Sequence, residues 1–502
     1  MAELKKMGKG LVSNYINLFK GRLISHLIGA IGSLLIIRIL EPQYYGDLSL
    51  AMSIPLMVGA FGNLGMNTAV TKFTAQYSND PAKAKQFISS GILFDILYGV
   101  TLSILGYILS PYIFTFIYNK PFLIGYGQFA SLYSMVYWPF SSIFSAMLGF
   151  EMTKYNGKLW IMHYFFQTLF TVVLALYWLK VDGVILGYML AYLLVVIYGI
   201  YTLYKEGLLK GISPSLRVIR QMLSFSAPLV LSSSLSTLAG IYASSIVNRI
   251  LSVVSISNIT AAGKIGFFFD TIFNPLSFAI QPLMSKLDKN NPENILKILT
   301  KIIKFNMIVK APLTVVIAAL SYPITELVIG AQYTSSPLFL KLIMIGYLIG
   351  SINGISIANS LVTFQGYTKP SSRSGIVNAV FNVILLTFLI VKFGPIGYYL
   401  AGFFSWIPGY IILYKFLRKI YNFKYPIKMT FRVLALTLVV LSPLFLISSL
   451  FGVALSIFLL IILFKLYKKT GILDKDEVDL LVNGIEETGL RPIAKIVSFI
   501  LS

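Results

Sequence analysis

The sequence predicts an all-α protein that crosses a membrane about 14 times. Of its 502 residues, 57% are hydrophobic and 12% are charged, whereas about a quarter of a soluble domain is usually charged. Long apolar runs recur along the chain, and nearly every lysine and arginine lies in a gap between them. The run 433–464 would measure roughly 48 Å as one helix, against a hydrocarbon core of about 30 Å. It must therefore fold back, and Ser448, Ser449 and Gly452 are expected to form the turn.

Each apolar run is long enough to cross the hydrocarbon core as a helix. The expected spans cover residues 22–40, 46–70, 87–109, 123–149, 159–179, 183–204, 224–250, 261–284, 303–320, 338–364, 375–391, 395–417, 431–447 and 449–467. The loops expected outside are short, the longest being 110–122 and 321–337. No extracellular domain is therefore expected.

The distribution of basic residues predicts the orientation. With a cytoplasmic N-terminus, 33 of the 41 lysines and arginines lie inside, seven lie at or near outer ends, and Lys310 lies within a span. Cytoplasmic loops carry such an excess of positive charge. We therefore expect a multi-pass protein of the cytoplasmic membrane with both termini inside. Lys5, Lys6 and Lys9 precede no short apolar region with a cleavage site, so no removable signal peptide is expected.

The spans group into two expected lobes. A cytoplasmic segment, 1–21, precedes an N-lobe of six spans, 22–204, and the basic linker 205–222 separates it from a C-lobe of six spans, 223–417. Two appended spans follow over 418–468, and then a tail, 469–502, whose apolar end 493–501 is too short to span and is expected to form a surface amphipathic helix. Because six is even, both lobes begin on the cytoplasmic side, which predicts a parallel pseudo-twofold repeat.

Short matches between the lobes support a duplication. They recur in the same order, at a nearly constant spacing, and at equivalent span ends. The matches are Arg38-Ile39-Leu40 with Arg249-Ile250-Leu251 (249 − 38 = 211), Asn79-Asp80-Pro81 with Asn290-Asn291-Pro292 (292 − 81 = 211), Thr153-Lys154 with Thr368-Lys369 (368 − 153 = 215), and Leu190-Ala191 with Leu400-Ala401 (400 − 190 = 210).

Composition excludes several function classes. The chain has no cysteine and only His26 and His163 as imidazoles, so thiolate chemistry is excluded and neither a metal site nor a cofactor is expected. The net charge is +23, but the basic residues lie between the spans and form no continuous stripe, which argues against nucleic acid as a partner. The one Asp-x-Asp, Asp474-Lys475-Asp476, lies in the tail beside no evident nucleotide site, so no enzymatic centre is expected there.

Polar stripes at helical spacing predict which spans face water. The first span carries Arg22, His26, Gly29 and Ser33; the second carries Ser49, Ser53, Asn63 and Asn67; the seventh carries Ser233, Thr237, Gly240, Ser244 and Asn248; and the eighth carries Asp270, Asn274, Ser277 and Gln281. Spans one and two are the repeat mates of seven and eight, so the stripes are expected to enclose a central hydrophilic cavity. Close helix packing by small residues is the alternative.

Charged residues near this cavity are candidates for binding and coupling. Buried carboxylates cost about 2.5–3.5 kcal/mol on insertion scales, so Asp95 and Asp270 need water, a partner or a function. His26 is a candidate proton carrier or a hydrogen bonder of the wall. The basic candidates for an anionic headgroup, chosen because arginine and lysine bind phosphate, are Arg22, Arg38, Lys72, Arg249 and Lys264. Snorkelling to lipid headgroups is their alternative role.

The chain also resembles a known family. Residues in and around the first two spans carry the resemblance: Arg38-Ile39-Leu40-Glu41-Pro42-Gln43-Tyr44-Tyr45-Gly46, then Gly62-Asn63-Leu64-Gly65 and Lys72. They resemble the opening of the polysaccharide transporter (Wzx-like) family, within the multidrug/oligosaccharidyl-lipid/polysaccharide (MOP) exporter superfamily. Phe225-Ser226-Ala227-Pro228-Leu229 and Gln281-Pro282-Leu283-Met284-Ser285 agree with it. The resemblance covers residues 8–468. It implies a MATE-like architecture and a flippase that moves polyprenyl-diphosphate-linked oligosaccharide outward by alternating access.

The sequence departs from that family pattern at two positions. Asn63 stands where many relatives carry an acid, and Ser244 or Ser245 stands where an Asp is common. The resemblance implies membrane lipids and a lipid-linked oligosaccharide as partners, with glycosyltransferases or polymerases as further candidates, and a monomer is expected. Two alternatives remain. A MATE-type cation or drug exporter would need an acidic cavity, and a membrane-embedded glycosyltransferase or ligase would need clustered carboxylates.

Overall fold

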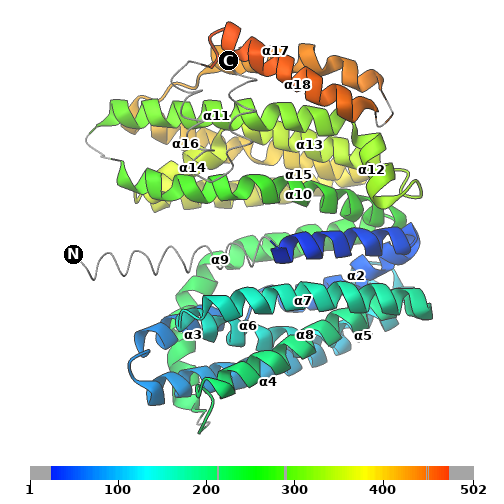
Figure 1. Ribbon diagram of the computed structural model, residues 1–502, viewed down its shortest axis with the longest axis vertical. Helices are drawn as coiled ribbons and strands as arrows, with labels where there is room; N and C mark the ends of the chain where they lie inside the picture. The colour runs from blue at the N-terminus through cyan, green and yellow to red at the C-terminus, as the bar shows by residue number, and fades with distance from the viewer. Residues whose placement is uncertain (1–23, 212–213, 288–290, 448, 450, 474–502) are drawn as a thin grey trace. The chain divides into compact units, whose positions relative to one another are not determined.

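The computed structural model describes residues 24–211, 214–287, 291–447, 449 and 451–473, and over these ranges the chain is helical without β-strands (Figure 1). The all-α prediction is therefore confirmed. By their contacts the residues group into two compact units, one that extends to Lys264 and one that begins at Ile265. The expected boundaries of the two lobes, the linker and the appended parts stay predictions.

The first unit consists of long helices joined by short turns. Its elements are a helix over Ile24–Ile39, α2 (Pro42–Val58), α3 (Met66–Gln76), α4 (Pro81–Tyr112), the π-helical turn η1 (Ile113–Ile117), the 3-10 turn η2 (Pro121–Leu123), α5 (Ile124–Ser131), α6 (Tyr133–Gly149), α7 (Thr153–Leu174), the π-helical turn η3 (Ala175–Leu179), α8 (Lys180–Lys205), α9 (Leu216–Ile250) and the start of α10 (Val253–Lys286).

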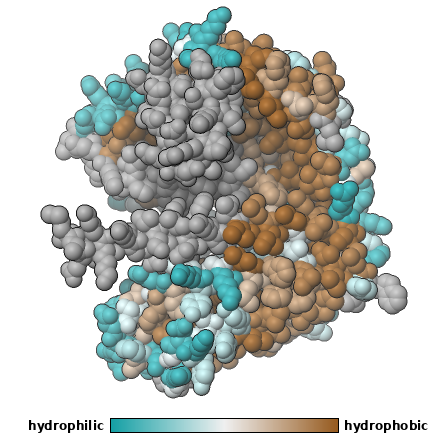
Figure 2. All heavy atoms as spheres, viewed as in Figure 1, coloured by the Kyte–Doolittle hydropathy of each residue, from teal (hydrophilic) through white to brown (hydrophobic). Residues whose placement is uncertain are grey.

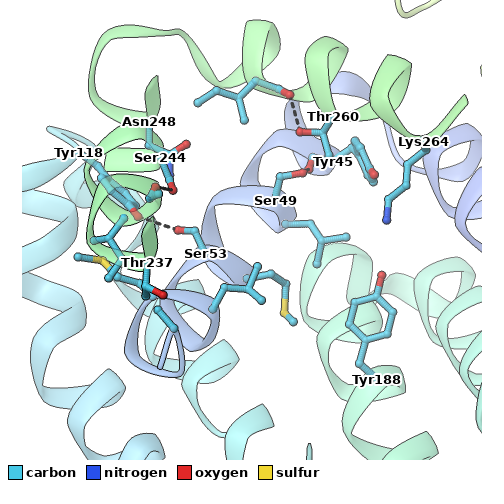
Figure 3. Close-up of a pocket in the computed structure, with 18 residues that line it drawn as sticks. Tyr45, Ser49, Ser53, Tyr118, Tyr188, Thr237, Ser244, Asn248, Thr260 and Lys264 are labelled. Carbon is cyan, nitrogen blue, oxygen red and sulfur yellow. Dashed lines mark hydrogen bonds between the residues drawn. The ribbon is translucent and has the colours of Figure 1, made fainter. Parts of the chain in front are cut away.

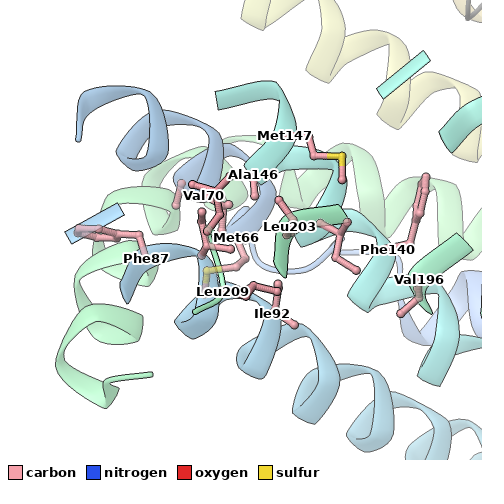
Figure 4. Close-up of a cluster of buried hydrophobic side chains, with 14 of the residues drawn as sticks. Met66, Val70, Phe87, Ile92, Phe140, Ala146, Met147, Val196, Leu203 and Leu209 are labelled. Atoms are coloured by element: carbon pink, nitrogen blue, oxygen red, sulfur yellow. The ribbon is translucent and has the colours of Figure 1, made fainter. Parts of the chain in front are cut away.

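The apolar faces of these helices form one core. Buried side chains from α3, α4, α6 and α8 meet the segment that follows α8 (Figure 4). Its members include Met66, Val70, Phe87, Ile92, Phe140, Ala146, Met147, Val196, Leu203 and Leu209. On the visible surface, hydrophobic side chains cover much of the length of these helices, and hydrophilic ones gather at the end where α3 lies (Figure 2). That distribution suits helices surrounded by lipid along their length.

The second expected span is two helices, α2 and α3, with an irregular segment at 59–65 between them. Gly62, Leu64 and Gly65 have positive φ angles of 64°, 53° and 75° there, a conformation that Gly adopts readily and Leu rarely. Two hydrogen bonds hold the segment. The Tyr98 hydroxyl donates to the Gly62 carbonyl at 2.7 Å, and Ser226 Oγ donates to the Leu64 carbonyl at 2.7 Å. The break is therefore fixed by α4 and α9.

The second unit continues α10 from Ile265 and adds eight more labelled α-helices and one 3-10 turn. These are α11 (Pro292–Ala319), α12 (Ser321–Ile329), α13 (Ser336–Asn353), α14 (Ile355–Phe364), α15 (Thr368–Ser405), α16 (Ile407–Tyr421), α17 (Ile427–Leu441), the 3-10 turn η4 (Ser442–Leu446) and α18 (Phe451–Lys469). One apolar cluster joins α11 to α14 and α16, and another joins α11 to α17 and α18. The appended spans thus pack on α11.

Helix starts occur at the spacing that the short sequence matches suggested. Helices α4 and α11 begin at Pro81 and Pro292, and the preceding residue caps each one. The Asp80 carboxylate accepts from the Lys83 amide at 3.2 Å, and the Asn291 side chain accepts from the Asn294 amide at 3.0 Å. A short polar side chain before Pro is a typical helix start. The same local chemistry therefore opens the third span of each predicted repeat.

Broken helices and residues that the structure does not describe both contribute to the difference between the 14 expected spans and the number of long helices in the described ranges. Eight described helical segments are long and apolar enough to cross a membrane, and shorter apolar helices cover Ile24–Ile39, Val253–Phe269 and Ile355–Phe364. One of the eight, Thr368–Tyr421, holds two expected spans that a bend at Gly394 (φ 55°) separates. Breaks also divide the fourth span after α5 and the tenth at Gly354.

Several helices extend beyond the expected spans, and two differences matter here. The loop expected at 321–337 contains a helix, α12, and α10 begins at Val253 rather than at 261. Ser252 explains the earlier start, because its Oγ accepts a hydrogen bond from the Ser255 amide at 3.1 Å and so satisfies a helix N-terminus. The earlier start adds two helical turns before Lys264, which places this lysine well inside the helix.

Candidate functional site

A cavity of about 690 Å³ with both apolar and hydroxyl-bearing side chains in its wall lies within the first unit, and we call it the α2–α9 cavity (Figure 3). It is bounded by α2, α8, α9, the start of α10 and the segment after η1. Its lining residues are Tyr45, Leu48, Ser49, Met52, Ser53, Leu56, Met57, Ala60, Tyr118, Tyr188, Thr237, Gly240, Ile241, Ser244, Asn248, Ile256, Thr260 and Lys264. Span two thus contributes the first half of its polar stripe to this cavity, and span seven contributes most of its own: Ser49 and Ser53, with Thr237, Gly240, Ser244 and Asn248.

The hydroxyl groups of this wall are held by their own helices. Ser49 Oγ donates to the Tyr45 carbonyl at 2.8 Å, Ser244 Oγ to the Gly240 carbonyl at 2.8 Å, and Thr260 Oγ1 to the Ile256 carbonyl at 2.8 Å. A hydroxyl that donates its proton still has lone pairs that accept. This part of the wall therefore offers more hydrogen-bond acceptors than donors to a ligand.

Lys264 supplies a cation to the cavity. It lies 11 residues into α10 (264 − 253), which is about 16 Å along the helix axis. Its side chain projects into the space opposite Tyr188 (Figure 3) and is exposed. Lys264 is the only Lys or Arg among the lining residues, and none of them is Asp or Glu. In this described cavity the fixed charge is positive.

Arg249 and Lys120 contact backbone carbonyls. Arg249 Nη1 donates to the carbonyls of Phe116 and Ile117 at 2.6 and 3.3 Å, so the arginine caps η1. Sequence reasoning missed Lys120, which is buried and donates to the Asn248 and Tyr118 carbonyls. Burial lowers the pKa of Lys120 from its ordinary value of 10.5. This lysine and Arg249 therefore link η1 and the following turn to the end of α9.

Asp95 is the centre of a buried network behind the break between α2 and α3. Asn63 Nδ2 donates to both carboxylate oxygens at 3.0 and 3.1 Å, and Ser142 Oγ donates to Oδ2 at 2.5 Å. All three side chains are at most 1% exposed, and Asp95 has no ion pair among the described residues. At position 63, where the resemblance leads us to expect an acid, the chain thus has an asparagine whose amide donates to Asp95.

A second cavity, of about 580 Å³, lies between α3, α6 and α7, and we call it the α3–α6–α7 cavity. Asn67 and Lys72 belong to its wall. The Lys72 ammonium lies 3.7 Å from the ring centroid of Phe225, a cation–π contact. The lining residues are Asn67, Thr68, Thr71, Lys72, Tyr137, Phe140, Ser141, Phe144, Ser145, Leu148 and Trp160.

The remaining candidates divide into described and undescribed residues. His26 is half-buried, and its ring centroid lies 5.9 Å from that of Tyr164. Arg38 is exposed in the last turn of its helix. Arg22 lies outside the described residues, as do the side chains of Asp270, Asn274 and Gln281 in α10. The structure thus brings Asn248 and Lys264 into one cavity, and Asn67 and Lys72 into another.

Glycines of the first and seventh spans serve two different roles. A Cβ at Gly32 of the first helix would lie 2.9 Å from Thr168 Cβ, so this glycine allows close packing on α7, as small residues often do in membranes. A Cβ at Gly240 would meet no atom within 4 Å. The packing alternative therefore holds for Gly32, and the cavity interpretation holds for Gly240.

Comparison with known proteins agrees with this architecture. The sequence model of the family described as "Polysaccharide biosynthesis protein" matches residues 11–288. An uncharacterized membrane protein of Methanocaldococcus jannaschii is 25% identical over 413 residues, which cover 74% of this chain and 90% of that protein.

Solved structures share the fold. Lipid II flippase MurJ, in an inward closed conformation, aligns with a TM-score of 0.69 at 18% identity, covering 91% of this chain and 100% of MurJ. A multidrug resistance MATE family transporter of the MOP superfamily, in an inward-facing conformation, aligns at 0.63 with 13% identity, covering 79% and 96%. A MOP superfamily transporter from Pyrococcus furiosus, whose title reports reverse polarity of its binding pocket, aligns at 0.53 with 12% identity, covering 82% and 96%.

The helical architecture and these alignments define a multi-pass membrane protein with the fold of MOP superfamily transporters. Since the family model covers more than half of the sequence, the chain belongs to the polysaccharide biosynthesis protein family. The resemblance noted in the sequence is confirmed.

Proposed function

We propose that this protein is a flippase that moves a lipid-diphosphate-linked oligosaccharide across the cytoplasmic membrane. The observation that carries the proposal is the hydroxyl-rich α2–α9 cavity with Lys264 inside a fold shared with a lipid II flippase. Membership of a polysaccharide biosynthesis family supports a glycan as the cargo. Membrane lipids and the lipid-linked glycan are the proposed partners.

The charge of Lys264 suits the diphosphate of such a headgroup, and the hydroxyls of the wall suit its sugar hydroxyls. A diphosphate cannot enter hydrocarbon without compensation for its charge, and Lys264 places an ammonium group about three helical turns into α10. Serine, threonine and tyrosine hydroxyls around it accept or donate to sugar hydroxyls. We propose that alternating access of the two predicted lobes carries the headgroup through, while the polyprenyl chain stays in lipid.

A MATE-type exporter of organic cations fits this cavity less well. A cationic substrate is favoured by acids or by aromatic rings free of competing cations. The described lining of the α2–α9 cavity has a lysine and no acid. Asp95 is occupied by two hydrogen-bond donors. Coupling of transport to an ion through Asp95, Asp270 or His26 stays a prediction.

Reconstitution tests the proposal. Purified protein in liposomes that contain a fluorescent lipid-diphosphate-linked oligosaccharide is expected to bring label to the opposite leaflet, measured with a membrane-impermeant quencher. Lys264→Met is expected to slow this movement at least tenfold and Lys264→Arg to retain most of it, since arginine keeps the charge. Lys392→Met is the matched control, because Lys392 is exposed outside the cavity. Label movement equal to that in empty liposomes would reject the function.

A further inference from the structure

The α3–α6–α7 cavity has an aromatic wall of fixed geometry. The ring centroid of Trp160 lies 5.4 Å from that of Phe140 and 5.6 Å from that of Phe144, and both pairs are T-shaped. Tyr137 completes the aromatic part of the lining. Edge-to-face pairs are favourable arrangements, so these rings hold one another in place from α6 and α7.

Polar groups of the same cavity lack partners within the described chain. The Asn67 Oδ1 atom accepts from the Thr68 amide at 2.7 Å, but the Asn67 Nδ2 donors form no hydrogen bond to described residues. The same holds for the hydroxyls of Ser141 and Ser145 on α6, which also line this cavity. The α2–α9 cavity differs, since several of its hydroxyls are bonded within their own helices.

We propose that this cavity binds a pyranose unit of a glycan. A pyranose carries C–H groups on its faces and hydroxyls around its rim. The C–H hydrogens are weakly positive and suit the negative face of an aromatic ring, while the hydroxyls pair with amide and hydroxyl groups. The wall of the α3–α6–α7 cavity offers both kinds of surface. A lipid tail would fit this cavity less well, because it leaves the amides and hydroxyls without hydrogen bonds. A cationic ligand is disfavoured by the positive charge of Lys72.

The two cavities follow one another along the second span. Helix α2 lines the first cavity from Tyr45 to Met57, and α3 lines the second from Asn67 to Lys72. The irregular segment 59–65 lies between these stretches. The inference rests on the proposed function in this respect: a headgroup in the α2–α9 cavity would be followed by a sugar subsite on the other side of the break.

Sugar binding to the purified full-length protein in nanodiscs tests the proposal independently of transport. The probes are the methyl pyranosides of glucose, mannose and N-acetylglucosamine, measured by saturation-transfer NMR. We expect transfer to the ring C–H protons of at least one glycoside. Trp160→Ala should reduce it at least fivefold, and Trp160→Phe should retain most of it. Trp406→Ala, which changes a tryptophan of α16's N-terminus outside this cavity, should have no effect.

A second variant covers the case in which Trp160→Ala does not fold. Ser141→Ala combined with Ser145→Ala removes two hydroxyls at little cost in packing and is expected to weaken sugar binding about threefold. Absence of transfer to all three glycosides, or transfer that neither set of substitutions changes, would overturn the subsite. Transfer to the alkyl chain of octyl glucoside without transfer to methyl glycosides would identify a lipid site instead. If the wild type binds sugar but moves no labelled lipid, only the flippase function fails.

Discussion

Replacement of Asp95 should destabilise the protein by an amount that the network around it sets. Asp95→Ala leaves the Nδ2 donors of Asn63 and the hydroxyl of Ser142 without their acceptor, and both donors are buried. Hydrogen bonds between membrane helices contribute about 0.6 kcal/mol on average and up to about 1.7 kcal/mol. Two donor groups lose their acceptor, so we expect the free energy of unfolding to fall by about 1–3 kcal/mol.

Asp95→Asn gives a graded second measurement. The side-chain oxygen of the new asparagine still accepts a hydrogen bond, but its Nδ2 group faces a donor. Roughly one hydrogen bond is lost, so about half of the fall in the free energy of unfolding is expected. Ser103→Ala is the matched control, because Ser103 Oγ makes one buried bond from α4, to the Ser131 carbonyl at 2.9 Å. Unfolding in mixed micelles, titrated with a denaturing detergent and followed by circular dichroism, measures all three variants.

A double-mutant cycle isolates the contact between Asn63 and Asp95. If the bond is as the structure places it, the cost of Asp95→Ala should fall by about 0.6–1.7 kcal/mol when Asn63 is already Ala. Equal stability of Asp95→Ala and the wild type would refute the reasoning. Exactly additive effects would refute the specific pairing, since residues in contact should couple.

Further predictions concern helix ends and the outer turn. Asn291→Ala should lower the free energy of unfolding by about 1 kcal/mol through loss of the α11 cap, whereas Asn291→Asp should keep it. Arg249→Ala should raise hydrogen exchange at η1, whose carbonyls it caps, and Arg249→Lys should restore part of the protection; unchanged exchange in both would exclude the cap. Burial lowers the pKa of Lys120 in the folded state, so its charge destabilises the fold until the lysine loses its proton. The free energy of unfolding of the wild type should therefore rise relative to that of Lys120→Met as pH increases toward 10.5. The same pH dependence of stability in both proteins would contradict this.

Substitution of both Arg38 and Arg249 tests a role of these two arginines as a gate for the cargo. The double Ala variant is expected to abolish export while the protein still folds and inserts, as measured by membrane fractionation and the reconstitution assay. Because Arg249 also caps η1, the single Arg38→Ala variant separates the two effects. Unchanged export in the double variant would remove the gate.

The sequence by itself determined the all-helical membrane architecture. Apolar runs and the charges between them report the preference of each segment for lipid, which depends on local composition alone. The predicted duplication has a local counterpart, since Pro81 and Pro292 open helices with equivalent caps. Breaks were less predictable: Gly62-Asn63-Leu64-Gly65 reads as part of an apolar span, and only contacts from Tyr98 and Ser226 fix its irregular backbone.

The tertiary structure decided what each polar residue faces. Helical periodicity shows which residues share a face, but not which neighbour lies opposite that face. Gly32 and Gly240 therefore look alike in sequence, yet one packs against Thr168 and the other opens onto a cavity. For the same reason Asp95 could not be paired with Asn63 from the sequence, because their bond joins segments 32 residues apart, and bonds of that kind depend on helix packing rather than on local preference.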